Sequence, residues 1–346
     1  MADRITSVPI GGVPTPTPKT VIVEARPRPS RPVSVAARVG DSIYSAITFL
    51  ASLSIFIIIL WLLWQLISAS QLSIHRFGWS FVTQSDWNEE TNSYHALSFI
   101  FGTLYSSLIA LVLAVPISIG AAVFLSELAP RWIRTPATFL IELLAAIPSV
   151  IYGLWGIFVL IPFLKVAIVG PIANSRLPHL PIIGALFEGQ SAGYSMLAAG
   201  VLLAIMVIPF ITAVTRDILR AIPRSQREGS YALGATQWET IAQVVIPYAK
   251  SGIIGAVVLG LGRALGETMA VTMVIGNQAP NTPSGISFSL LSSGYTMSSV
   301  LANKFNEATP GLNLSALVEI ALVLFGVTIV VNIIARMLVF YTAKNL

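Results

Sequence analysis

The chain has 346 residues, of which 55% are hydrophobic and only 10% are charged, and its mean hydropathy is +0.81. About a quarter of the residues in a soluble globular domain are charged, so this composition predicts a polytopic membrane protein. The chain has no cysteine, which excludes disulfides and thiolate metal sites, and its three histidines lie far apart in presumed loops. The net charge of +5 arises from residues beside apolar runs, where they set orientation, so nucleic acid is not an expected partner.

The N-terminal residues 1–40 contain seven of the 21 prolines and show no helical apolar period. This pattern predicts a disordered, Pro-rich tail. The first apolar run, from Ile43 to Ile67, has no charge and is long enough to cross a bilayer. We interpret it as an uncleaved first transmembrane helix, because a signal peptide has a shorter apolar core.

Five further apolar runs each meet the length of about 20 residues that one crossing needs. They cover about residues 99–125, 137–164, 194–214, 252–276 and 314–341. The prediction is an all-α transmembrane domain of six helices over residues 41–346. Fifteen of the 20 Lys and Arg residues fall in the tail, the second and fourth connections and the C-terminal end, which places both termini in the cytoplasm.

Four prolines fall inside these runs and are expected to kink their helices: Pro116, Pro148, Pro162 and Pro209. Ser149 and Tyr152 follow Pro148 and place hydroxyl groups beside its kink. Such a stretch suits a transport pathway, but hydroxylated and small residues serve equally often as contacts between packed helices. Both interpretations stay open at this point.

The outer connections, 70–96 and 277–313, are long and mix aromatic with polar residues. They are long enough to receive a partner. Alternatively, their aromatic side chains only mark the membrane interface.

A polar segment, Glu228 to Pro247, interrupts the apolar runs, and basic residues flank it within a longer loop, 216–250. It therefore faces the cytoplasm. Residues 227–233 can form a short amphipathic helix, and Gly234 permits the positive φ that ends it. Thr236 and Glu239 have the spacing of a capping box for a second helix.

The spacing of this segment resembles the cytoplasmic signature of permease subunits of binding-protein-dependent ABC importers. Glu228, Gly234 and Pro247 match the signature at the required spacing. Gly229 and Ser230 replace its two alanines, and Val244 and Ile246 replace its Ile and Leu. The resemblance implies a coupling helix that docks on an ATPase subunit, with Tyr231, Leu233 and Trp238 as apolar anchors. The alternative is an amphipathic loop on the lipid surface.

A second segment, Gly260 to Ala270, reads Gly-Leu-Gly-Arg-Ala-Leu-Gly-Glu-Thr-Met-Ala and is similar to a segment of phosphate-specific importer permeases. The run 262–277 is most like the C-type of their two unlike permeases. This resemblance implies a type I importer permease in the bacterial inner membrane, acting on inorganic phosphate. It also implies a second permease, an ATPase dimer and an extracytoplasmic phosphate-binding protein as partners. The chain has no phosphate-binding loop of the Gly-x-x-x-x-Gly-Lys-Ser/Thr type, so ATP and Mg²⁺ are expected in the ATPase subunit, and this chain is expected to be neither an enzyme nor a cofactor carrier.

Arg263 and Glu267 lie within the fifth apolar run, where a charge costs about 2.5–3.5 kcal/mol. Their i, i+4 spacing places them on one helical face, so they can neutralise each other. Alternatively, Arg263 offers hydrogen-bond donors to passing phosphate while Glu267 positions it. Candidate pathway residues are therefore Arg263, Glu267, Thr268, Ser149 and Tyr152.

Two other acids fall within apolar runs. Glu142 is expected to form an interfacial ion pair near the cytoplasmic end of the third span. Glu319 is expected to reach the outer interface from the last span.

Other functions remain to be weighed against phosphate import. The same architecture serves a permease for sulfate or molybdate. A polytopic membrane enzyme acting on lipid phosphates would use Arg263 and Glu267 as its site, but the sequence offers no nucleophile and base to accompany them. A structural or sensory membrane subunit is a third possibility.

Overall fold

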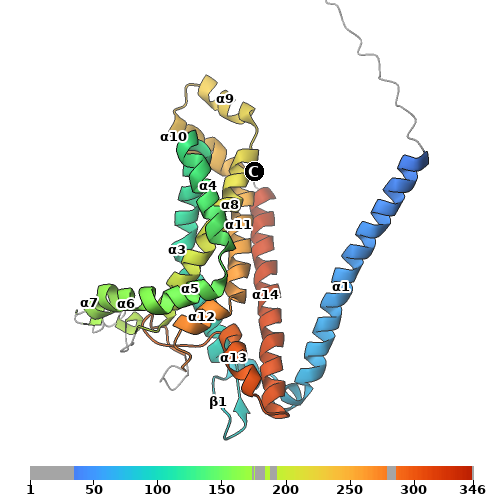
Figure 1. Ribbon diagram of the computed structural model, residues 1–346, viewed down its shortest axis with the longest axis vertical. Coiled ribbons are helices and arrows are strands. Elements are labelled where there is room, and N and C mark those ends of the chain that lie inside the picture. Colours follow the sequence, from blue (N-terminus) through green and yellow to red (C-terminus); the bar gives the residue numbers. More distant parts are fainter. Residues whose placement is uncertain (1–34, 174, 176–183, 188–192, 279–285, 345–346) are drawn as a thin grey trace, which may run out of the picture. The chain divides into compact units, whose positions relative to one another are not determined.

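The computed structural model describes residues 35–173, 175, 184–187, 193–278 and 286–344 (Figure 1). The predicted tail, 1–40, lies mostly outside these described residues. The first helix begins at Val35, so the last residues assigned to the tail are helical. The chain divides into two compact units, residues 1–58 and 59–346.

The described elements, in chain order, are as follows. The N-terminal half contains α1 (Val35–Phe77), α2 (Ser80–Thr83), β1 (Trp87–Asn88), β2 (Ser93–Tyr94), α3 (Leu97–Val123), η1 (Phe124–Leu128), α4 (Arg131–Ala146), α5 (Ser149–Trp155), η2 (Gly156–Leu160), α6 (Ile161–Leu164), η3 (Lys165–Val169) and α7 (Gly170–Ala173). The C-terminal half contains η5 (Gly184–Leu186), α8 (Met196–Ala221), α9 (Arg224–Ala232), α10 (Gln237–Thr240), η6 (Ile241–Val245), α11 (Ile246–Gly266), α12 (Met269–Val274), α13 (Met297–Lys304), η7 (Phe305–Glu307) and α14 (Leu312–Lys344).

Six helical stretches of the described chain are long and apolar enough to cross a membrane, which confirms the predicted fold class. They are Gly40–Phe77, Leu97–Leu128, Ser149–Ile172, Met196–Ala221, Gln237–Gly266 and Leu312–Tyr341.

Helix α8 is the centre of the bundle, because a larger share of it is buried than of any other described span. It packs along α3, where Gly200 lies against Ile109 so closely that a Cβ atom on the glycine would overlap that side chain. Hydroxyl groups add polar contacts between the two helices: Ser118 Oγ donates to the carbonyl of Ile208, and Thr212 Oγ1 donates to the carbonyl of Ser118. Small and hydroxylated residues thus hold α3 and α8 together, as is usual where lipid removes the hydrophobic driving force.

The third predicted span, 137–164, is interrupted in the structure. Helix α4 ends at Ala146, Ile147 and Pro148 are extended, and the apolar helical stretch resumes at Ser149. Proline has no N–H to donate and forces the preceding residue out of the helical region, so Pro148 breaks the helix where only a kink was expected. Pro116 and Pro209, in contrast, lie within continuous helices.

The two-stranded hairpin of β1 and β2 lies at the end of the bundle opposite α9 (Figure 1). Tyr94, Phe99 and Met297 form part of an apolar cluster that joins this hairpin to α3 and α13. The Lys304 ammonium at the end of α13 donates to the Glu89 carboxylate and forms an ion pair with it. This hydrogen bond lowers the pKa of Glu89 below its ordinary value of 4.5, although burial opposes the shift.

The ion pair predicts a pH-dependent hairpin. A carboxyl whose pKa is lowered by folding stabilises the fold above its unfolded pKa and loses that contribution as the pH falls through its folded pKa. We therefore expect hydrogen-exchange protection of residues 87–94 to decrease below about pH 4.5. Lys304→Gln should show low protection of these residues both above and below this pH. If Lys304→Gln kept the pH dependence of the wild type, groups other than this ion pair would cause the transition.

Candidate functional site

The polar segment predicted to face the cytoplasm forms two short helices, α9 and α10, at one end of the bundle (Figure 1). Gly234 ends α9 with a φ of +86°. The N–H of Ala235 donates to the carbonyl of Ser230, and that of Gly234 donates to Tyr231, which is the hydrogen-bond pattern of a Schellman motif. Thr236 and Glu239 make the predicted capping box at the start of α10. These local predictions are confirmed.

The α9–α10 loop presents large apolar side chains to its surroundings. Tyr231 is 46% exposed, Leu233 is 91% exposed and Trp238 is 71% exposed. Glu228 and Gly229 are also exposed, whereas Ser230 is half-buried and its hydroxyl hydrogen-bonds that of Thr240 at 3.0 Å. Pro247 is the second residue of α11 and directly follows η6, which continues the helix from α10. We call the exposed set Tyr231, Leu233 and Trp238 the coupling surface.

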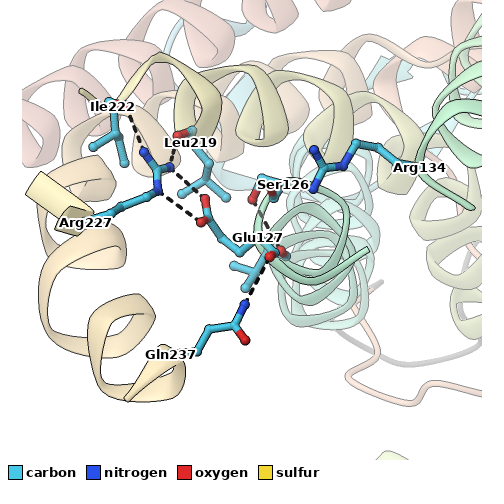
Figure 2. Close-up of polar contacts among 8 residues, drawn as sticks. Ser126, Glu127, Arg134, Leu219, Ile222, Arg227 and Gln237 are labelled. Carbon is cyan, nitrogen blue, oxygen red and sulfur yellow. Dashed lines mark hydrogen bonds and ion pairs between the residues drawn. The ribbon is translucent and has the colours of Figure 1, made fainter. Parts of the chain in front are cut away.

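Arg227 fixes this loop to the membrane helices (Figure 2). Its Nε and Nη2 atoms donate to the two carboxylate oxygens of Glu127 at 3.1 and 2.8 Å. The same guanidinium donates to the carbonyls of Leu219, in the last turn of α8, and of Ile222, just after its end, both at 2.9 Å. An arginine here donates to carbonyls at the end of a helix, where the regular helical hydrogen bonds stop. One side chain therefore joins α9 to the last turn of α8 and to η1, the continuation of α3.

Helix α10, the second helix of the loop, also contacts Glu127 of η1. Gln237 Nε2, at the start of α10, donates to the carbonyl of Glu127 at 3.2 Å, as Figure 2 shows. The side chains of Glu127 and Arg227 are 11% and 17% exposed, so water screens their attraction only in part. Helices α9 and α10 are thus both bonded to η1, so a displacement of the loop is transmitted to α3.

Sequence reasoning did not find Glu127. The residue stands 100 positions before its partner, and nothing near it in the chain predicts the pairing. The only indication in the sequence is that Glu127 lies just before Arg131 and Arg134. An acidic residue in a loop expected to be positive indicates a specific partner. The ion pair of Glu142 was expected, and its partner is Arg216, at 3.2 Å.

The buried acid Glu319 contradicts its prediction. Its side chain is 6% exposed, and Oε2 has no hydrogen-bond partner among the described residues, so it does not reach the outer interface. The neighbouring Ser315 explains the burial. Ser315 Oγ donates to the carbonyl of Ala69, and the N–H of Ser73 donates to the same hydroxyl, which packs this end of α14 against α1.

The structure separates Arg263 from the expected helical pairing with Glu267. Helix α11 ends at Gly266, and Glu267 is extended, with φ −71° and ψ 124°. The carbonyl of Glu267 accepts from Ser298 Oγ at 2.8 Å, and its carboxylate accepts from the N–H of Ala270 at 3.4 Å. The prediction that both residues share one helical face is therefore wrong. Glu267 instead caps the start of α12, with α13 holding the turn in place.

Arg263 is half-buried in the last turn of α11. Its guanidinium carbon lies 5.8 Å from the centre of the Phe210 ring, within the range of a cation–π contact. Its Nε atom is buried and has no hydrogen-bond partner within the described part of the chain. A guanidinium N–H without a partner in a membrane span can donate a hydrogen bond to an anionic ligand.

The remaining pathway candidates lie on neighbouring elements. Thr268 lies between α11 and α12, with its hydroxyl donating to the carbonyl of Gly266. Ser149 and Tyr152 lie on α5, which packs against α12 so tightly that a Cβ atom on Gly153 would lie 3.2 Å from the Cα atom of Ala270. Tyr152 is buried, and its hydroxyl donates to the carbonyl of Leu144 across the break at Pro148. That hydroxyl is thus engaged within the fold.

Comparisons with known proteins agree with the resemblances of the segments 228–247 and 260–270. The family model for the inner membrane component of binding-protein-dependent transport systems matches residues 114–341. A phosphate transport system permease protein PstC of Haemophilus influenzae is 45% identical over 301 residues, covering 86% of this chain and 93% of that protein. The PstC protein of Mesorhizobium japonicum is 42% identical over 320 residues, covering 92% and 96%.

Solved structures with low sequence identity share the fold. A chain of a bacterial alginate ABC transporter complex gives a TM-score of 0.55 at 16% identity, covering 86% of this chain and 94% of that one. A chain of the MetNI methionine ABC transporter gives 0.52 at 17% identity, covering 71% and 95%. The chain therefore belongs to the family of binding-protein-dependent transport system inner membrane components, as a multi-pass permease subunit of an ABC transporter.

Proposed function

We propose that this chain is one of two unlike permeases of an ATP-driven importer for inorganic phosphate, with both termini in the cytoplasm. The observation that carries the substrate assignment is the 45% identity to a phosphate transport permease over 86% of the chain. The segment around Arg263 supports it, because a guanidinium in a membrane span suits a tetrahedral oxyanion. Sulfate and molybdate have similar shapes, so competition decides between them. Excess sulfate or molybdate should leave uptake of radioactive phosphate into vesicles unchanged.

The proposed pathway runs past Arg263, with Thr268 and Ser149 as further hydrogen-bonding groups. The tight packing of α5 on α12 supports this grouping, since it holds both elements near the end of α11. Glu267 acts by fixing the turn after Arg263. Tyr152 acts by holding α4 to α5, because its hydroxyl is engaged with Leu144.

The coupling surface is proposed to dock on an ATPase dimer, which binds ATP and Mg²⁺ and hydrolyses the nucleotide. The exposure of Leu233 and Trp238 supports this, since large apolar side chains at 91% and 71% exposure gain most from being covered. An extracytoplasmic phosphate-binding protein is proposed to deliver substrate at the outer loops.

Replacing Leu233 with Asp tests the docking surface. Burying a carboxylate without a partner costs several kcal/mol, so the ATPase subunit should no longer co-purify with the permease. Trp238→Ala should weaken the complex by about 2 kcal/mol, or about thirtyfold in Kd. Phe305→Asp is the control, because Phe305 is also exposed but lies at the outer end. Retention of the ATPase by Leu233→Asp would refute docking at this surface.

A further inference from the structure

A groove opens between α8, α11 and α14 at the end of the bundle that carries α9. Its volume is about 570 Å³, and its lining is almost entirely apolar, with Val214, Gly255, Leu259 and Val339 among its residues. Gly252 brings α11 against Ile218 of α8, where a Cβ atom would overlap. A Cβ atom on Gly255, one turn further, would meet no heavy atom within 4 Å, so the groove is open there.

Arg336 is the charged residue of this groove. It is exposed, and within the described part of the chain its side chain makes no hydrogen bond or ion pair. It lies five residues before the end of the last span at Tyr341, which is about 8 Å along a helix axis. A long cationic side chain at this depth reaches the level of the lipid head groups.

A second apolar hollow, of about 410 Å³, is lined by residues of α14 alone and also includes Arg336. Met337, Phe340 and Tyr341 line it. Arg336 thus lines both apolar hollows. This is the arrangement that one phosphate group above two hydrocarbon chains requires.

From this geometry we propose that the groove binds an anionic phospholipid, with its phosphate on Arg336 and its acyl chains in the two hollows. Basic pockets between transmembrane helices near the cytoplasmic leaflet bind anionic head groups, and an apolar cavity of this size with few polar groups, here Asn332 and Arg336, is typical of a ligand site. A free phosphate ion would gain nothing from the apolar lining. The apolar lining therefore favours a lipid over free phosphate, and the charge of Arg336 favours a lipid with an anionic head group.

Native mass spectrometry of the full-length chain in its purified complex tests the proposal. The probes are phosphatidylglycerol and phosphatidylcholine with identical acyl chains. One arginine near the membrane surface contributes about 1 kcal/mol, so the wild type should bind phosphatidylglycerol about fivefold more tightly. Arg336→Gln should reduce this preference to none, while Arg131→Gln, which removes an exposed arginine of α4, should keep it.

A second variant separates the groove from the charge. Gly255→Leu places a side chain in the open part of the groove and should weaken binding of both lipids. Gly120→Leu is its control, since Gly120 is also an open helical glycine. An unchanged preference in Arg336→Gln, or no lipid bound by the complex because the second permease covers the groove, would overturn the proposal.

Discussion

Replacing Arg263 with glutamine is expected to abolish phosphate uptake while the complex still assembles and hydrolyses ATP. Arg263 is half-buried, and its Nε lacks a partner among the described residues, so its donors are free for a passing oxyanion. Hydrogen bonds to charged groups contribute about 1.5–3 kcal/mol each, so loss of two should reduce uptake by two orders of magnitude or more. Uptake of radioactive phosphate and ATP hydrolysis, measured on the same proteoliposomes, check this.

Glu267→Gln provides the matched comparison. The amide oxygen of glutamine can still accept from the N–H of Ala270, so the start of α12 should hold and uptake should decrease only a few-fold. If Arg263→Gln transported normally, the guanidinium would serve only the packing against Phe210. Equal, severe losses in both variants would instead show that the two charges act together in transport.

Replacing Arg227 with glutamine is expected to uncouple ATP hydrolysis from transport. The variant loses two bonds to Glu127 and two to the end of α8, a loss of about 3–5 kcal/mol for a largely buried ion pair. Helix α9 then moves without α3, so we expect ATP hydrolysis to persist while phosphate moved per ATP decreases at least tenfold. Hydrogen exchange of the α9 amides should accelerate in parallel.

The bonds of Arg227 also predict the ranking of its variants. Glu127→Gln keeps the bonds from Arg227 to the two carbonyls and should cause a smaller loss than Arg227→Gln. Exchanging the two residues should not restore coupling, because a glutamate at position 227 cannot donate to Leu219 and Ile222. Arg224→Gln is the control, since Arg224 is exposed on the same helix. A normal transport ratio in Arg227→Gln would show that the loop does not need this attachment.

Features governed by neighbouring residues were predictable from the sequence. Gly234 ends α9 and Thr236 begins α10 because such caps depend on a few consecutive residues. The apolar runs predicted the spans because membrane thickness fixes their length. Glu127 and Arg227 were not paired in advance, because 100 residues separate them and only the packing of α3 against α8 brings them together.

Two errors have a common physical origin. The predicted pairing of Arg263 with Glu267 required α11 to continue past Gly266. The predicted third span required one helix to continue through Pro148. Where a helix ends within a membrane depends on which neighbouring groups form hydrogen bonds with the backbone N–H and C=O groups that the helix leaves free. Here Ser298 of α13 bonds the carbonyl of Glu267, and Tyr152 bonds the carbonyl of Leu144. Neither partner is visible in the local sequence.

The break at Pro148 divides the chain into two mechanically distinct parts. On one side, α4 is bound to α8 through Glu142 and Arg216. On the other, α5 is locked against α12 at Gly153. Hinge motions concentrate in a few residues at element ends, so we expect any pivot between α4 and α5 to lie at the extended link 147–148. The hydrogen bond from the Tyr152 hydroxyl to the carbonyl of Leu144 spans this link, so it must break before the two helices can move apart. Proline fixes the φ angle of residue 148, so a rotation at this link has fewer dihedral angles to use.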